Sequence, residues 1–75
     1  MEQDRIIEIL KQRGFKQNSS LKNSLRIYNY KAIVWLSGYV TISIVTPNTG
    51  RFLSEKTYED ENLLVNYLDT LPFLK

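Results

Sequence analysis

The stretch IVWLSGYVTISI, residues 33–44, decides the fold, because β-branched and aromatic residues flank a Ser-Gly pair. We interpret Ser37 and Gly38 as a two-residue hairpin loop between antiparallel strands. In that register three pairs share one face: Leu36 with Tyr39, Val34 with Thr41, and Ala32 with Ser43. The opposite face holds a bulkier apolar set, namely Ile33, Trp35, Val40, Ile42 and Ile44. This second face is therefore predicted to be the core face, with Trp35 buried.

The flanking sequence extends the hairpin into a larger sheet. Residues 48–50, Asn-Thr-Gly, fit a three-residue loop with Gly50 in the left-handed conformation. That loop pairs Thr46 with Phe52 on the core face and leaves Val45 and Leu53 on the outer face. Upstream, residues 25–28 are predicted to form a strand that points Leu25 and Ile27 inward, and residues 15–17 fit a further short strand.

Two amphipathic helices flank the predicted strands. Residues 2–13 place Ile6, Ile7, Ile9 and Leu10 on one arc of the helical wheel. Gly14 then suits a left-handed helix stop, with Phe15 folding back onto the helix. Residues 58–71 are predicted to form the second helix, with Thr57 as the N-cap. Its inner arc would hold Leu63, Leu64, Tyr67, Leu68 and Leu71.

These elements predict an α+β fold. We expect a single two-layer domain over residues 1–75, in the order α-β-β-β(-β)-α, with an antiparallel sheet and two helices packed on one face. The other face of the sheet is left uncovered. No apolar run approaches the roughly 20 residues needed to cross a bilayer, and no leader segment precedes the first helix. The expectation is a complete cytoplasmic protein with no membrane attachment.

The composition argues against most catalytic chemistry. The chain has no His and no Cys, which removes the usual general base and the usual ligands of zinc and iron–sulfur centres. The glycines stand at positions 14, 38 and 50, too far apart for a phosphate-binding loop. Residues 59–61 are acidic but adjacent on the predicted helix, so they fan outward. We expect a non-enzymatic protein without a cofactor or metal, which acts by binding.

Charge is distributed unevenly along the chain. No acidic residue lies between Glu8 and Glu55, although the formal net charge is only +2. Lys11 and Arg13 fall at the end of the first helix, where the helix dipole favours cations. The remaining cations of this stretch are candidate nucleic-acid contacts or an ordinary solvated surface: Lys16, Lys22, Arg26, Lys31 and Arg51.

The uncovered sheet face is the second candidate feature. It is more apolar than a solvent-facing side of an antiparallel sheet normally is, and Tyr and Arg are frequent at interface hot spots. The leading hypothesis is a protein-binding module, an inhibitor or adaptor. Its candidate contacts are Arg26, Tyr28, Leu36, Tyr39, Val45, Arg51 and Leu53. Small size and a composition rich in Lys, Asn, Ile and Tyr favour a phage or mobile-element protein that blocks a host nucleic-acid enzyme, of the anti-CRISPR type.

Three other interpretations stay open, apart from a one-residue error in the predicted register, which would swap the two faces. In the first, the protein binds single-stranded nucleic acid: Tyr28 and Tyr39 stack on bases while the five cations hold phosphates. In the second, a homodimer covers the face. In the third, strand propensity alone explains the apolar residues and the face has no partner.

Overall fold

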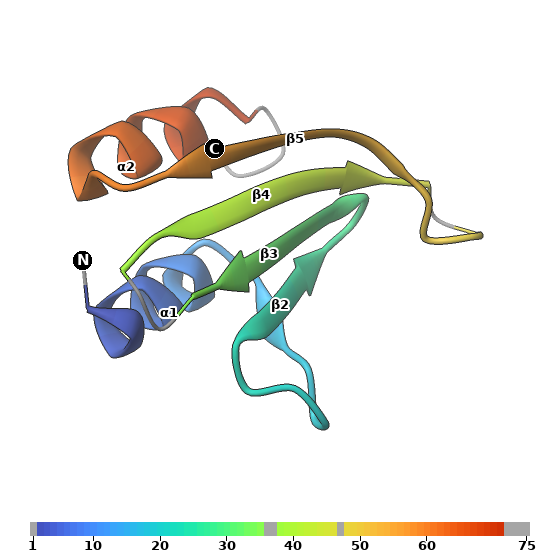
Figure 1. Ribbon diagram of the computed structural model, residues 1–75, viewed down its shortest axis with the longest axis horizontal. Coiled ribbons are helices and arrows are strands. Elements are labelled where there is room, and N and C mark those ends of the chain that lie inside the picture. The colour runs from blue at the N-terminus through green and yellow to red at the C-terminus, as the bar shows by residue number, and fades with distance from the viewer. Residues whose placement is uncertain (1, 36–37, 47, 72–75) are drawn as a thin grey trace.

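The computed structural model describes residues 2–35, 38–46 and 48–71. In chain order the elements are α1 (Gln3–Gln12), β1 (Lys16–Gln17), β2 (Ser24–Ile27), β3 (Tyr30–Val34), β4 (Val40–Val45), β5 (Phe52–Tyr58) and α2 (Glu61–Thr70). The strands form one antiparallel five-stranded sheet in the order β1-β2-β3-β4-β5 (Figure 1). The predicted α+β fold is confirmed, and β1 is the short strand expected near residues 15–17.

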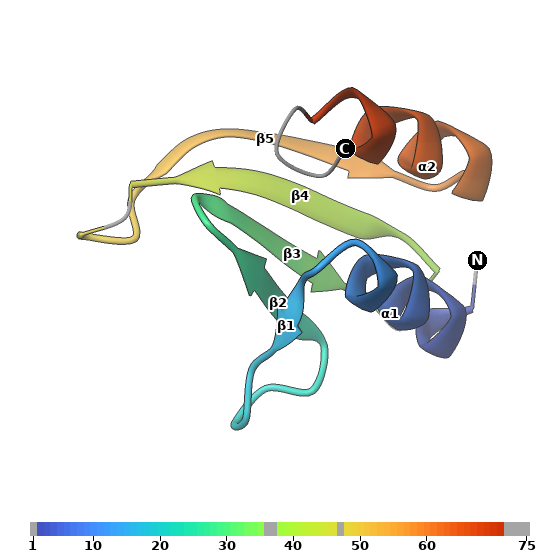
Figure 2. The same ribbon diagram turned by 180° about the vertical axis from the view of Figure 1, so that it is seen from behind.

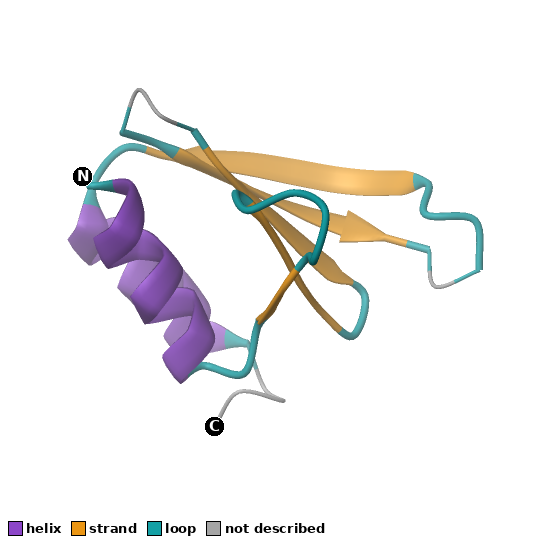
Figure 3. Ribbon diagram, turned by 90° about the horizontal axis from the view of Figure 1, so that it is seen from below, coloured by secondary structure: helices purple, strands orange, loops and turns teal. Residues whose placement is uncertain are grey.

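Both helices pack on the same side of the sheet (Figure 3). They run parallel to each other, because Arg5 pairs with Glu61 near their first turns and Arg13 pairs with Asp69 near their ends, at 3.0 and 3.3 Å. Seen from behind, the helices stand in front of one end of the sheet, and the β4–β5 hairpin extends past them (Figure 2). Among the described residues, no helix is long and apolar enough to cross a membrane.

The core lies between the helices and one sheet face, which we call the helix-covered face. Its centre consists of side chains at most 2% exposed, contributed by α1, α2 and the three inner strands: Ile6, Leu10, Leu25, Ala32, Val34, Val40, Ile42, Leu64 and Leu68. Ile27 and Tyr30 pack against this cluster from the β2–β3 hairpin. No helix in the described part of the chain lies over the opposite side of the sheet, which we call the outer face.

The first helix ends as the sequence predicted. Gly14 has φ +95°, the left-handed conformation, and its N–H donates to the Lys11 carbonyl at 3.0 Å. The Phe15 N–H donates to the Leu10 carbonyl, also at 3.0 Å, and both side chains are buried. This pair of bonds is the Schellman motif, which satisfies carbonyls that the helix end leaves free.

The second helix begins later than predicted. Asp60, not Thr57, is the N-cap, and its carboxylate accepts hydrogen bonds from the N–H groups of Asn62 and Leu63. Thr57 lies in β5, where it pairs with Thr41, so strand pairing overrides its capping propensity. Leu63 was predicted on the inner arc of this helix, and that prediction is wrong, because Leu63 is 59% exposed. The buried residues of α2 are Leu64 and Leu68.

The β3–β4 hairpin differs from the predicted register by one residue. The Trp35 N–H donates to the Tyr39 carbonyl at 2.8 Å, and Gly38 has φ +97°, so three residues connect the strands instead of two. Val34 therefore faces Val40 and Ala32 faces Ile42, which puts four aliphatic side chains on the helix-covered face.

That shift reverses the faces of β3 alone. A one-residue slip moves every side chain of a strand to the other side. Val34 was predicted on the outer face and is in the core, whereas Ile33 and Trp35 were predicted in the core and lie outside. The predictions for Val40 and Ile42 are confirmed, since both are buried in the core. Leu36 and Ser37 fall outside the described residues.

Two further local corrections concern the ends of the hairpins. Val45 pairs with Phe52 and Ile44 with Ser54, so the expected pairs Thr46–Phe52 and Val45–Leu53 are wrong. Leu53 is the extra residue of a β-bulge, which breaks the regular alternation of β5. Tyr28 does not belong to β2, because residues 28–29 form the turn to β3 and Tyr28 has φ +48°.

Candidate functional site

A row of aligned positions crosses the outer face from edge to edge. Lys16 on β1 pairs with Arg26 on β2, Arg26 pairs with Lys31 on β3, and the row continues through Ser43 to Glu55. We call Lys16, Arg26 and Lys31 the cation row. Like charges directly opposite each other on neighbouring strands destabilise a sheet. In the part of the chain that the structure describes, both ion pairs join the two helices and neither involves the cation row.

The far end of the outer face carries an exposed aromatic ring. Phe52 is 50% exposed, and the Lys31 ammonium lies 5.8 Å from the centre of its ring, a cation–π contact. The Lys31 side chain starts opposite Ser43 and ends at Phe52, the partner of Val45. Ser43 and Val45 are buried although no described helix covers this face.

The near end carries a second ring, that of Trp35. Its indole N–H donates to the Thr41 hydroxyl at 3.2 Å, and the Thr41 hydroxyl contacts the Thr57 hydroxyl at 3.0 Å. Trp35 remains 45% exposed, while Thr41 is nearly buried. The indole is therefore fixed to the sheet surface by one hydrogen bond and still presents much of its ring to solvent.

Two adjoining cavities open beside the cation row. One has a volume of about 150 Å³ and is lined by all three cations together with Asn18, Leu21, Ser24 and Leu25. The other has a volume of about 460 Å³ and is lined by Gly14, Lys16, Arg26, Ile27 and Tyr28. Lys16 and Arg26 line both cavities, and the described residues that line them include no carboxylate. This corner of the molecule is suited to an anionic ligand.

Tyr28 marks the rim of the larger cavity. It is the only described residue other than glycine with a positive φ, and its side chain is 71% exposed. Bulky residues in the left-handed region cost about 1–3 kcal/mol, and such strain is concentrated at functional sites. The tight turn between Ile27 and Tyr30 imposes this conformation, since those two residues pair directly.

The structure brings only part of the predicted protein-binding set together. Arg26 lies on the outer face, Tyr28 in the neighbouring turn, and Leu53 in the β5 bulge with 64% exposure. Val45 is on the outer face but 1% exposed, and Tyr39 is half-buried beside the β3–β4 loop. Leu36 lies outside the described residues.

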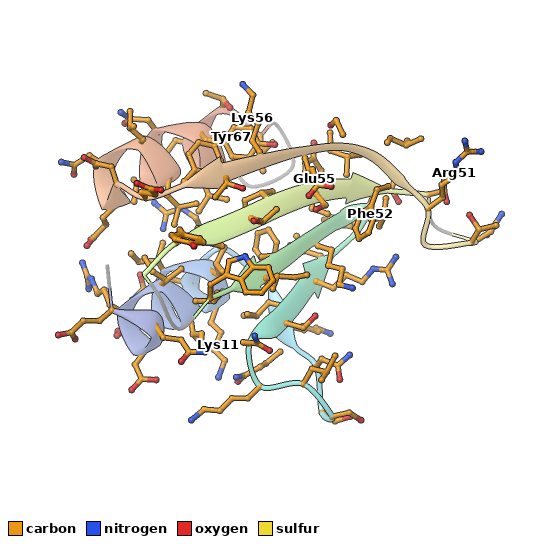
Figure 4. The ribbon with its side chains drawn as sticks, in the orientation of Figure 1. Lys11, Arg51, Phe52, Glu55, Lys56 and Tyr67 are labelled. Carbon is orange, nitrogen blue, oxygen red and sulfur yellow. The ribbon has the colours of Figure 1, made fainter. Side chains whose placement is uncertain are left out.

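The predicted nucleic-acid set is more closely grouped. Lys16, Arg26 and Lys31 form the cation row, and Lys22 is exposed in the β1–β2 loop. Arg51 lies beside Phe52 at the end of the β4–β5 hairpin, with Glu55 further along β5 (Figure 4). The sequence interpretation missed Trp35 and Phe52 as exposed rings, because both were placed on the core face. The signal that could have found Trp35 is Gly38, which also suits the last position of a three-residue loop.

A second aromatic group lies on the helix-covered side. Tyr58 and Tyr67 stack with ring centres 5.2 Å apart. Burial raises the pKa of both phenols, and for Tyr67 repulsion from Tyr30 and Tyr58 adds to the increase. These tyrosines stay neutral at physiological pH and contribute to packing. Among the described residues, no group of three metal-ligating side chains could hold a metal ion.

Comparisons with known proteins add no relative: no family model, curated protein or solved structure matches this chain.

Proposed function

We propose that this protein binds single-stranded nucleic acid through its outer sheet face. The observation that carries the proposal is the cation row, which lies beside two exposed aromatic rings, Trp35 and Phe52, on a face that no described helix covers. Proteins that bind single strands combine a basic surface along the backbone with rings on which bases stack. The outer face offers both.

The arrangement of the rings supports this reading. Trp35 contacts Thr41 and Phe52 is the partner of Val45, so the rings stand at opposite ends of β4. At a rise of roughly 3.4 Å per residue, Thr41 and Val45 are about 14 Å apart. Between the rings lie Thr41 and Ser43, and the Lys31 side chain crosses the face from opposite Ser43 to Phe52, where its ammonium is placed to contact a phosphate. Arg51 lies beside Phe52 and extends the positive charge to that end (Figure 4).

Fluorescence of Trp35 provides the test, because the chain contains one tryptophan. Titration with a single-stranded oligonucleotide at low salt should quench or shift its emission, since a stacked base replaces water at the ring. The logarithm of the affinity should fall with the logarithm of salt concentration, with a slope of about −2 for three phosphate contacts. No binding of single-stranded DNA or RNA at low salt would refute the proposal.

Matched variants locate the surface, with affinity followed by anisotropy of a labelled oligonucleotide. Trp35→Ala and Phe52→Ala should each weaken binding by about 1–3 kcal/mol, the contribution of one stacked base. Leu63→Ala is the control, because Leu63 is also an exposed apolar residue but lies on α2. Lys31→Gln should weaken binding, whereas Lys56→Gln should not, because Lys56 pairs with Ile42 and so belongs to the other face.

A protein partner is the second candidate, and a different observation favours it. β5 is an edge strand, and residues 52–57 are all exposed. An open edge can accept a strand from another chain by continuing the hydrogen-bond ladder. Self-pairing of β5 is less favourable, since a two-fold axis at Glu55 or Lys56 would bring identical charges together. An inhibitor or adaptor of this kind would depend on Leu53, 64% exposed, and not on the cation row. Leu53→Ala and Lys31→Gln therefore distinguish the two candidates in a pull-down.

A further inference from the structure

We infer that the smaller cavity beside the cation row binds the terminal phosphate monoester of the strand. This inference rests on the proposed function and assigns one end of the ligand to one corner of the site. Lys16, Arg26 and Lys31 all line the cavity, whose volume is about 150 Å³, and its described lining includes no carboxylate. Lys16 and Arg26 are direct cross-strand partners there, and Lys31 lines the cavity while its ammonium lies 5.8 Å from the centre of the Phe52 ring.

The charge of the ligand decides between an internal and a terminal phosphate. An internal phosphodiester carries one negative charge, whereas a phosphate monoester carries about 1.5 to 2 at pH 7 and offers three acceptor oxygens. Lys16 and Arg26 repel each other in the free protein, because they are direct cross-strand partners, and Lys31 is the partner of Arg26 on its other side. A dianionic group relieves this repulsion better than a monoanionic one. The cavity therefore prefers a terminal phosphate.

The wall of the cavity is already ordered by hydrogen bonds within the chain. The Asn18 side-chain oxygen accepts from the N–H groups of Ser20 and Leu21, and the Asn18 N–H donates to the Ser24 carbonyl at 2.7 Å. The Gln17 side-chain amide donates to the Lys22 carbonyl. These bonds fix the β1–β2 loop in place without a ligand. A preformed wall lowers the entropic cost of binding.

The larger cavity provides space for the terminal nucleoside. It has a volume of about 460 Å³, shares Lys16 and Arg26 with the phosphate cavity, and has Tyr28 at its rim. A phosphate held by the shared cations would place the attached sugar and base toward Tyr28. The strained conformation of Tyr28 then serves binding, because it places the Tyr28 ring where the terminal base lies.

The test compares three versions of one labelled oligonucleotide: with a 5′-phosphate, with a 3′-phosphate, and with hydroxyl groups at both ends. One of the two phosphorylated oligonucleotides should bind with about fivefold higher affinity at low salt than the oligonucleotide with hydroxyl groups at both ends. This is the effect expected of a few solvent-exposed charge contacts. Whichever phosphorylated oligonucleotide binds more tightly shows whether the 5′ end or the 3′ end of the strand enters the cavity. Arg26→Gln and Lys16→Gln should bring the three affinities together, whereas Lys56→Gln, on the helix-covered side, should keep the preference.

The possible results separate this inference from the proposed function. If all three oligonucleotides bind equally, the terminal-phosphate assignment is wrong while nucleic-acid binding stands. If none binds at low salt, both fail. Thermal unfolding of Arg26→Gln and Lys16→Gln serves as the folding control. These variants remove like-charge repulsion, so their midpoints should be no lower than that of the wild type.

Discussion

The two faces of the sheet differ in what their side chains do. The helix-covered face is lined by aliphatic residues at most 2% exposed, among them Leu25, Val34 and Ile42. The outer face combines a row of like charges, a half-exposed tryptophan and small polar residues. Burial on the first face provides most of the stability, so the second can keep groups that do not favour folding. The difference indicates that the fold is held from one side and presents the other for binding.

The test with the largest expected effect removes one side chain from the core and one from the outer face. Leu10→Ala, at a fully buried position, should lower the free energy of unfolding by about 2–5 kcal/mol, through lost burial and an unfilled cavity. Trp35→Ala should cost about 1 kcal/mol, because the ring is 45% exposed and makes one side-chain hydrogen bond. Urea denaturation followed by circular dichroism measures both. Equal losses would mean that the outer face is as structural as the core.

A smaller effect tests the start of α2, which packs on the helix-covered face. Asp60→Ala should cost about 1 kcal/mol, since two backbone N–H groups lose the carboxylate that accepts them. Thr57→Ala is the matched control for the predicted cap, because Thr57 pairs within β5 and its hydroxyl contacts Thr41 instead. If Thr57→Ala shortened the helix by circular dichroism and Asp60→Ala did not, the position of the cap would be wrong.

The elements that the sequence predicted well depend on local chemistry. The end of α1 follows from Gly14 and Phe15, which lie within one turn of the residues they contact. The register of β3 depends instead on one residue more or less in a loop, and both loop lengths are common between strands. The aliphatic pairs Val34–Val40 and Ala32–Ile42 form only in the longer version. Core packing against the helices selects this version, and sequence periodicity alone does not show it.

The site was harder to predict than the fold, because its parts come from different strands. The five cations were found from charge, but only the pairing of β1, β2 and β3 shows that three of them are neighbours. Lys16 and Lys31 are far apart in the sequence, and nothing local places them in one row. Phe52 was assigned to the core because the bulge at Leu53, which changes the alternation of β5, has no clear sequence signal.

The third test concerns the strain beside the outer face. Tyr28→Gly should raise the free energy of unfolding by about 0.5–1 kcal/mol, because glycine adopts a positive φ without the clash that tyrosine has, and this gain exceeds its larger entropy loss. The same variant should weaken binding of the oligonucleotide with the preferred terminal phosphate. A gain in stability together with a loss of affinity would show that Tyr28 is kept for binding. A variant less stable than the wild type would show that the turn is not strained.

The smallest effect concerns alkaline pH and the packing of the helix-covered side. Burial raises the pKa of Tyr58 and Tyr67 above the ordinary value of 10.0, so the folded protein retains protons that the unfolded chain has released. The folded state then binds more protons, and the free energy of unfolding falls as pH rises. The contribution is complete below pH 10 and is lost as pH passes through the raised pKa values. Urea unfolding at pH 7, 9 and 10.5 should show a loss only at the highest value, and Tyr67→Phe should reduce it. A loss that begins below pH 9 would assign the effect to another group and leave the two tyrosines as ordinary packing residues.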